Sequence, residues 1–175
     1  MTRNFAARFN RMYKVDYFPE PTAYNFGEQL VKIPGLDGSG KMGKSEGNAI
    51  NLIDAPEVIR KKVMRAVTDS GPVTGQEMAE PVKNLFTLLK IVSTTDTVEQ
   101  FNKAYNDGVI RYGDLKKQLA EDIIKFTTPI RERILELQAN NDYLRKVIEQ
   151  GAEKARASAS KTIKEVREII GFRKF

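Results

Sequence analysis

The chain is organised around the loop DGSGKMGKSEGN at residues 37–48. Two lysines, Lys41 and Lys44, stand among four glycines, and Met42 is the only large apolar residue of the loop. Glycines allow backbone N–H groups to approach an anion, and the lysines supply positive charge. The composition is that of a phosphate-binding loop or of a solvated connector.

One interpretation of this loop is a Walker A motif, because residues 38–45 fit the pattern Gly-x4-Gly-Lys-Ser. A P-loop requires a buried strand that leads directly into the first glycine and a helix that begins at the lysine. Here residues 34–37 separate the short predicted strand Leu30–Ile33 from the loop, and residues 46–49 make a poor first helical turn. A P-loop NTPase that hydrolyses ATP with Mg²⁺ is therefore the least favoured alternative.

A second interpretation rests on residues 41–45, KMGKS, which differ by one letter from the KMSKS loop of class I aminoacyl-tRNA synthetases. The residues that follow resemble the corresponding segment of tryptophanyl-tRNA synthetases at Asn48, Ile50, Leu52, Asp54, Pro56, Ile59, Lys61, Lys62, Ala66, Thr68 and Asp69. Residues 2–10 are similar to the family's helix ahead of the loop, and residues 151–157 and 165–167 to its last helix. The resemblance covers essentially the whole chain and departs at Gly43, where the family usually has Ser.

The chain contains no histidine, so it cannot carry the HIGH motif of this family. That motif lies in the family's N-terminal half, together with most of the amino-acid pocket. The resemblance therefore implies the C-terminal part of a longer enzyme, produced either by truncation or as a natural half. We expect the isolated chain to be inactive.

Composition bounds the remaining function classes. Apolar residues make up 41% of the chain and charged residues 30%, which is typical of a soluble globular protein. No stretch approaches the roughly 20 apolar residues that cross a bilayer, so no membrane role is expected. The chain lacks cysteine as well as histidine, so we expect neither disulfides nor a transition-metal site. With no secretory pattern at the start, the expected location is the cytoplasm.

The net charge of +6 favours a polyanionic partner. The excess is C-terminal, because residues 111–175 hold 15 Lys/Arg against 10 Asp/Glu.

The expected fold class is mainly α. Hydrophobic periodicity and helix-start signals predict helices over residues 3–13, from Asp54 to about Thr68, and over 81–93, 96–107, 112–139, 141–148 and 152–170. Asp54 is expected to cap the second helix, and Pro129 to kink the long one. Asn141 is expected to cap the next helix, and Gly151 to separate it from the last.

In the last helix we expect a buried apolar side made of Ala152, Ala155, Ala159, Ile163, Val166 and Ile170. Lys154, Lys161 and Lys164 fall on the opposite side. The Gly/Pro-rich stretch 70–75 predicts a domain boundary. Residues 1–72 would then be the end of a Rossmann-like catalytic domain, and residues 73–175 a helical anticodon-binding domain.

The resemblance also implies a reaction, in which ATP activates tryptophan and the tryptophanyl group is transferred to tRNA(Trp). Lys44, and secondarily Lys41, would stabilise the departing pyrophosphate, and Ile33 would cover the adenine. The implied ATP-binding residues are Ile33, Lys41, Met42, Gly43, Lys44 and Ser45, with Mg²⁺ arriving on ATP and no metal site of the chain's own. The full-length enzyme would be a homodimer, and its partners would be L-tryptophan and tRNA(Trp). A non-catalytic tRNA-binding fragment is the main alternative.

Overall fold

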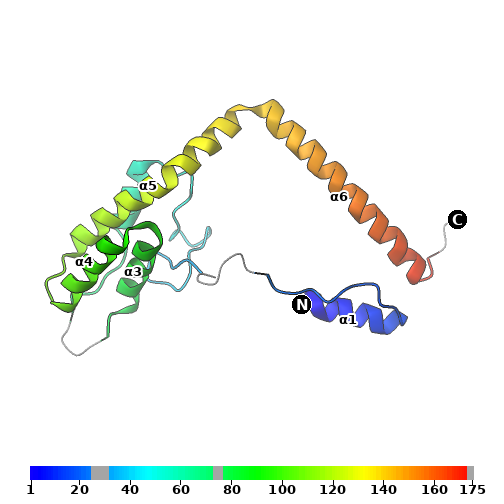
Figure 1. The fold of residues 1–175 in the computed structure, drawn as a ribbon, viewed down its shortest axis with the longest axis horizontal. Helices are drawn as coiled ribbons and strands as arrows, with labels where there is room; N and C mark the ends of the chain where they lie inside the picture. Colours follow the sequence, from blue (N-terminus) through cyan, green and yellow to red (C-terminus); the bar gives the residue numbers. More distant parts are fainter. Residues whose placement is uncertain (25–31, 73–76, 173–175) are drawn as a thin grey trace. The chain divides into compact units, whose positions relative to one another are not determined.

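The computed structural model describes residues 1–24, 32–72 and 77–172, in which six helices and no strand occur. The helices are α1 (Thr2–Tyr13), α2 (Pro56–Met64), α3 (Glu80–Val92), α4 (Thr95–Asn106), α5 (Tyr112–Ala139) and α6 (Asn141–Ile169) (Figure 1). The mainly α prediction is confirmed. The predicted strand at 30–33 lies partly outside the described residues, and Lys32 and Ile33 are not in a strand.

The chain forms two compact units. Gln29–Ala139 form the loop-bearing unit, and Met1–Glu28 together with Asn140–Phe175 form the terminal unit. The boundary between these units differs from the domain boundary expected at 72/73, because α2, which precedes that boundary, packs against α5, which follows it. The predicted division into a catalytic and an anticodon-binding part stays a prediction about function.

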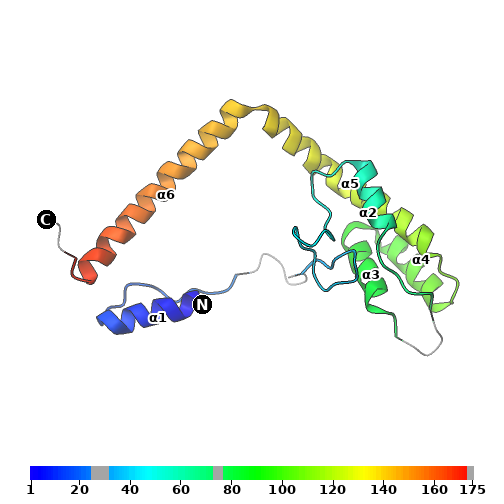
Figure 2. The same cartoon turned by 180° about the vertical axis from the view of Figure 1, so that it is seen from behind.

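The loop-bearing unit has its own hydrophobic core. Helix α5 packs against α2 and α3, and α3 packs against α4 (Figures 1 and 2). The core consists of Leu36, Ile59, Val63, Ala66, Val82, Leu85, Phe86, Leu88, Leu89, Leu115, Leu119, Ala120 and Ile123. Leu36 belongs to the segment that leads into the glycine-rich loop, so the same core that holds the helices also anchors one end of that loop.

Helix α2 starts and ends differently from the prediction. Asp54 does not cap it; its carboxylate accepts hydrogen bonds from the Asn51 N–H at 2.9 Å and from Lys62 Nζ at 2.6 Å. A charged ammonium is a stronger partner than the neutral N–H groups of a helix start, which explains the difference. The helix ends at Met64, and the Val67 N–H then donates to the Leu36 carbonyl at 2.9 Å. The residues after α2 thus leave the helix and hydrogen-bond to the segment that leads into the loop.

Helix α6 is one continuous helix, so the predicted break at Gly151 is wrong. A single glycine in a helix interior costs about 1 kcal/mol relative to alanine, which is too little to interrupt a helix with many good helix formers on both sides. The cap is also shifted by one residue, because the Asn140 side chain accepts from the Tyr143 N–H at 3.0 Å. Helix α5 likewise continues through Pro129.

The expected burial of the last helix's apolar side is also wrong. No residue of α6 is buried, Ala155 and Ala159 are exposed, and Ile163 is 47% exposed. Within the terminal unit, the segment that follows α1 contacts α6 near its C-terminal end, because the Tyr17 hydroxyl donates to Glu165 Oε2 at 2.8 Å. At 1.5 Å per residue, α1 is about 18 Å long and α6 about 44 Å, so α1 can cover only part of α6.

Among the described residues, no helix is both long enough and apolar enough to cross a membrane.

Candidate functional site

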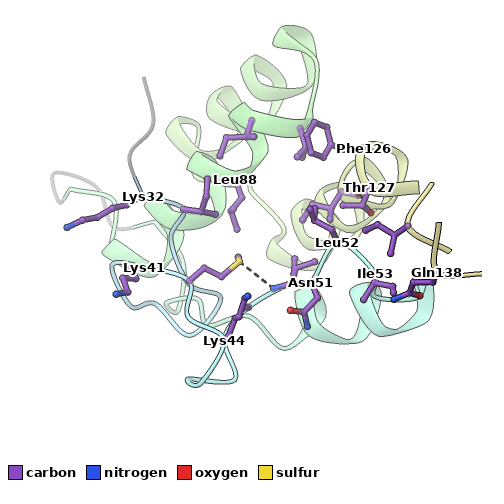
Figure 3. A pocket seen from close by; sticks show the side chains of 18 residues that line it. Lys32, Lys41, Lys44, Asn51, Leu52, Ile53, Leu88, Phe126, Thr127 and Gln138 are labelled. Carbon is purple, nitrogen blue, oxygen red and sulfur yellow. Dashed lines mark hydrogen bonds between the residues drawn. The ribbon is translucent and has the colours of Figure 1, made fainter. Parts of the chain in front are cut away.

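A cleft in the loop-bearing unit has a volume of about 800 Å³. It lies between the segment 32–53 and the two helices α3 and α5 (Figure 3). Its lining residues are Lys32, Ile33, Lys41, Met42, Lys44, Ala49, Ile50, Asn51, Leu52, Ile53, Leu88, Ile91, Val92, Ile123, Phe126, Thr127, Ile134 and Gln138.

The cleft has a cationic end and an apolar end. Lys32 and Lys41 lie on one side of the cleft and Lys44 lies between them and Asn51, and these three lysines define the cationic end, whereas Ile53 and Phe126 lie on the opposite side (Figure 3). No lining residue is an Asp or Glu, and none of the salt bridges between described residues involves the three lysines. The cationic end therefore suits an anion, and the other end suits an apolar or aromatic group.

The structure brings most of the predicted ATP-binding residues together. Ile33, Lys41, Met42 and Lys44 all line the cleft. The Met42 N–H donates to the Ile33 carbonyl at 2.6 Å, so the residue expected to cover adenine is hydrogen-bonded to the loop expected to hold phosphate. Ile33 is 40% exposed, which leaves its side chain accessible.

Gly43 and Ser45, the other two predicted residues, do not line the cleft. The Gly43 N–H donates to Asn48 Oδ1 at 2.9 Å, so in this conformation it is not free to bind a phosphate. A Cβ atom at Gly43 would lie 2.9 Å from the carboxyl carbon of Glu46. A serine at this position would therefore require the Glu46 side chain to move.

Asn48 is the polar centre of the loop; from the sequence it was named only as part of the family resemblance and was assigned no role. Its side chain is buried with 4% exposure. The Nδ2 group lies within hydrogen-bonding distance of Asp37 Oδ1 at 3.0 Å, Ser39 Oγ at 2.8 Å and the Lys41 carbonyl at 3.1 Å. The turn signal Asp-Gly-Ser at 37–39 was readable from the sequence. Its pairing with a residue eleven positions later becomes visible only in the fold.

Two carboxylates near the loop are held in their charged form. Hydrogen bonds from Ser39, through its side chain and its backbone N–H, and from Asn48 lower the pKa of Asp37 below its usual value. At Asp54, burial alone would raise the pKa, but the hydrogen bonds from Lys62 and Asn51 outweigh it and the pKa is lowered. Lys62 Nζ also donates to the Ala49 carbonyl at 2.9 Å, so this ion pair ties α2 to the end of the loop.

Other basic residues divide into paired and unpaired groups. On α2, Arg60 forms two hydrogen bonds with Glu121 of α5, at 2.6 and 3.0 Å, so it is not part of a free basic face. On α6, the lysines expected to oppose the apolar side, Lys154, Lys161 and Lys164, are all exposed. None of them takes part in a salt bridge between described residues.

Residues 1–128 match a family model described as tRNA synthetases class I (W and Y). The chain belongs to this family of class I tRNA synthetases. It is 60% identical over 174 residues to the tryptophan–tRNA ligase of Porphyromonas gingivalis, with 99% of this chain and 53% of that relative covered. It is 35% identical over 175 residues to the tryptophan–tRNA ligase of Deinococcus radiodurans, with 99% and 52% covered.

The fold agrees with these sequence relationships. It is similar to the tryptophanyl-tRNA synthetase of Campylobacter jejuni complexed with ADP and tryptophan, with a TM-score of 0.72 and 26% identity. The match covers 97% of this chain and 52% of that structure's chain. This synthetase chain thus spans about half the length of the curated relatives it matches.

The geometry of the loop does not support the Walker A alternative. Residues 44–47 form turns, and the next helix, α2, begins only at Pro56. A P-loop needs the helix N-terminus directly behind its lysine, because the helix's free N–H groups bind the phosphate.

Proposed function

We propose that this chain acts as the C-terminal half of a tryptophan–tRNA ligase, a cytoplasmic homodimer that activates tryptophan with ATP and transfers it to tRNA(Trp). In the first step, a tryptophan carboxylate oxygen attacks the α-phosphorus of ATP, which arrives with Mg²⁺. The bond from the α-phosphorus to the bridging oxygen breaks, and pyrophosphate leaves with the electron pair. In the second step, the 3′-terminal hydroxyl of the tRNA displaces AMP from the tryptophanyl-adenylate.

The cationic end of the cleft carries this proposal. Negative charge builds up on the leaving pyrophosphate in the transition state, and an ammonium group placed beside it lowers the barrier. Lys44 and Lys41 face a cleft whose lining contains no carboxylate to neutralise them. Ile33, which is hydrogen-bonded to Met42, would cover the adenine, so the base and the phosphates would occupy neighbouring parts of one site.

The test is adenylate formation in the full-length enzyme that carries this sequence. Lys44→Ala should slow single-turnover formation of tryptophanyl-adenylate about a hundredfold, with tryptophan affinity unchanged, because the charge acts in the transition state. Lys103→Ala is the matched control, since Lys103 is an exposed lysine on α4 that does not line the cleft. If the Lys44→Ala enzyme formed adenylate as fast as wild type, Lys44 would have no role in that step.

The proposal assigns tRNA binding to the helices that follow residue 72. Single-stranded bases of the anticodon arm would be read by polar side chains, and phosphates held by lysines. Lys154, Lys161 and Lys164 of α6 support this role, because they are exposed and form no salt bridge with another described residue. Each phosphate contact should steepen the salt dependence of binding by roughly one unit of log–log slope.

Replacing these three lysines with glutamine should weaken tRNA(Trp) binding and flatten the salt slope, while circular dichroism stays helical. The control carries the same charge change at three exposed basic residues that precede residue 72, Arg8, Arg11 and Lys14. If both triple variants bound tRNA with the same affinity and salt slope, the α6 lysines would make no contact with the tRNA. Residues 112–140 would then become the candidate surface.

A non-catalytic tRNA-binding fragment is the second candidate, because the chain spans only about half of its relatives and holds no histidine. The isolated 175-residue chain should accordingly bind tRNA weakly and show no tryptophan-dependent ATP–pyrophosphate exchange. Measurable exchange from this chain would contradict the expectation that it is inactive on its own.

A further inference from the structure

The proposed mechanism assigns no role to Asn48, although its buried side chain lies at the centre of the lysine loop. Its side-chain Nδ2 group has two hydrogens and lies within hydrogen-bonding distance of four oxygen acceptors, namely Asp37 Oδ1, Ser39 Oγ, the Lys41 carbonyl and, at 3.4 Å, Glu46 Oε2. Its Oδ1 accepts from the Gly43 N–H, between the lysines. The two ends of one amide thus hold the backbone on both sides of Met42.

The backbone of Asn48 continues this connection into the core. Its carbonyl accepts from the Leu36 N–H at 3.2 Å, and Leu36 is one of the buried core residues. The loop is also tied to α3, because Asn84 Nδ2 donates to the Ser39 carbonyl at 3.1 Å. The position of the lysines relative to the cleft therefore depends on a chain of contacts that passes through Asn48.

Gly35 provides the space for this amide. A Cβ atom at Gly35 would lie 2.4 Å from Asn48 Nδ2, 2.5 Å from Asp37 Oδ1 and 2.6 Å from Ser39 Oγ. All three atoms belong to the same hydrogen-bonded cluster, so none of them can move without breaking a bond. Only glycine at position 35 therefore leaves room for the Asn48 side-chain amide.

We propose that Asn48 is a positioning residue, which holds the loop so that Lys41 and Lys44 face the cleft with the spacing that pyrophosphate requires. This inference rests on the proposed function of those lysines. Asn48 itself touches no reacting atom; it acts through Asp37, Ser39 and the backbone of residues 41 and 43. The pair Asp37–Asn48 is its centre, because an ionised carboxylate accepts strongly from an amide N–H.

The Asp37–Asn48 pair can be tested by swapping its two residues in the full-length enzyme. Asn48→Asp keeps the shape but places a second carboxylate beside Asp37 and removes the donor, so adenylate formation should slow roughly tenfold in single-turnover assays. Tryptophan affinity should not change. The double variant Asp37→Asn/Asn48→Asp restores one donor facing one carboxylate but not the hydrogen bond to the Lys41 carbonyl, so it should recover part of the lost rate.

A milder variant covers the case in which Asn48→Asp does not fold. Ser39→Ala removes one acceptor of Asn48 and one donor to the Lys41 carbonyl, and should slow adenylate formation about threefold. Asn141→Asp, an exposed Asn→Asp change at the start of α6, is the control and should leave the rate at the wild-type value.

The outcomes separate this inference from the function on which it rests. If Lys44→Ala is slow and Asn48→Asp is as fast as wild type, Asn48 is only structural and the inference is overturned, whatever happens to the melting temperature. The inference is also overturned if the double variant Asp37→Asn/Asn48→Asp forms adenylate as slowly as Asn48→Asp. If Lys44→Ala is itself as fast as wild type, the proposed function fails and takes this inference with it.

Discussion

The two compact units of this chain are stabilised in different ways. In the loop-bearing unit, all thirteen residues of the core cluster come from Leu36 and from α2, α3, α5 and the residue Ala66 after α2. In the terminal unit, Ala6 is the only buried hydrophobic residue among those described. Helix α6 thus relies on its own backbone hydrogen bonds and on helix propensity, whereas α5, of nearly equal length, is held by burial. Equal secondary structure does not mean equal tertiary support.

The largest expected effect is a cavity in the better-packed unit. Leu119→Ala, at a fully buried position of α5, should lower the free energy of unfolding by about 3 kcal/mol. Ile148→Ala, at a 68% exposed position of α6, should change it by about 0.5 kcal/mol or less. Urea unfolding of the 175-residue chain, followed by circular dichroism, measures both. Similar costs at the two sites would erase the contrast between the units.

A glycine substitution in the lysine loop should have the next largest effect. Gly35→Ala places a Cβ atom 2.4 Å from Asn48 Nδ2 and should destabilise the loop-bearing unit by about 2 kcal/mol, as overpacking does elsewhere. Hydrogen exchange should show the loss first at the amides of Leu36, Met42 and Gly43, which the loop network protects. Unchanged protection there would mean that the loop adjusts without loss of its hydrogen bonds.

A smaller, pH-dependent effect is expected at the ion pair that ties α2 to the loop. The pKa of Asp54 is lowered in the folded chain, so its contribution is present above the unfolded value of about 3.9 and is lost as the pH falls through the lower folded value. Asp54→Asn should therefore lower stability by about 1 kcal/mol at pH 7, and by much less at pH 3. The measurement is urea unfolding at both pH values.

Asp16→Asn serves as the control for this change. Asp16 is an exposed carboxylate in the terminal unit, so its replacement controls for the loss of one negative charge at the surface. A pH-independent cost for Asp54→Asn would indicate that packing, and not charge, holds this residue.

The smallest effect is a gain in the terminal unit. Gly151→Ala should stabilise α6 by somewhat less than 1 kcal/mol, because a Cβ atom there meets nothing within 4 Å and alanine favours helix. Amide exchange in the middle of α6 should slow by a few-fold. The same Gly→Ala change thus has opposite signs in the two units; a loss of stability at 151 would reveal a contact on α6 that the fold does not show.

Local signals in the sequence determined the helical class and most helix positions. The helix at Tyr112–Ala139 was predicted from Tyr112 to about Ala139, because its apolar residues recur regularly over a long segment. The lysine loop was also evident, because four glycines and two lysines stand together within twelve residues. Residues such as Lys41 and Lys44 stand out for this reason before any fold is known.

The tertiary structure decided the features that depend on competition between partners. Asp54 carries a helix-start signal, yet Lys62 takes its carboxylate, and this preference depends on a distance that the sequence does not give. Gly151 carries a break signal, yet its local cost is smaller than the gain from continuing the helix. Asn48 carries no strong local signal. Its role arises because folding brings Gly35, Asp37 and Ser39 around one buried amide, whose hydrogen bonds must all be made within the protein.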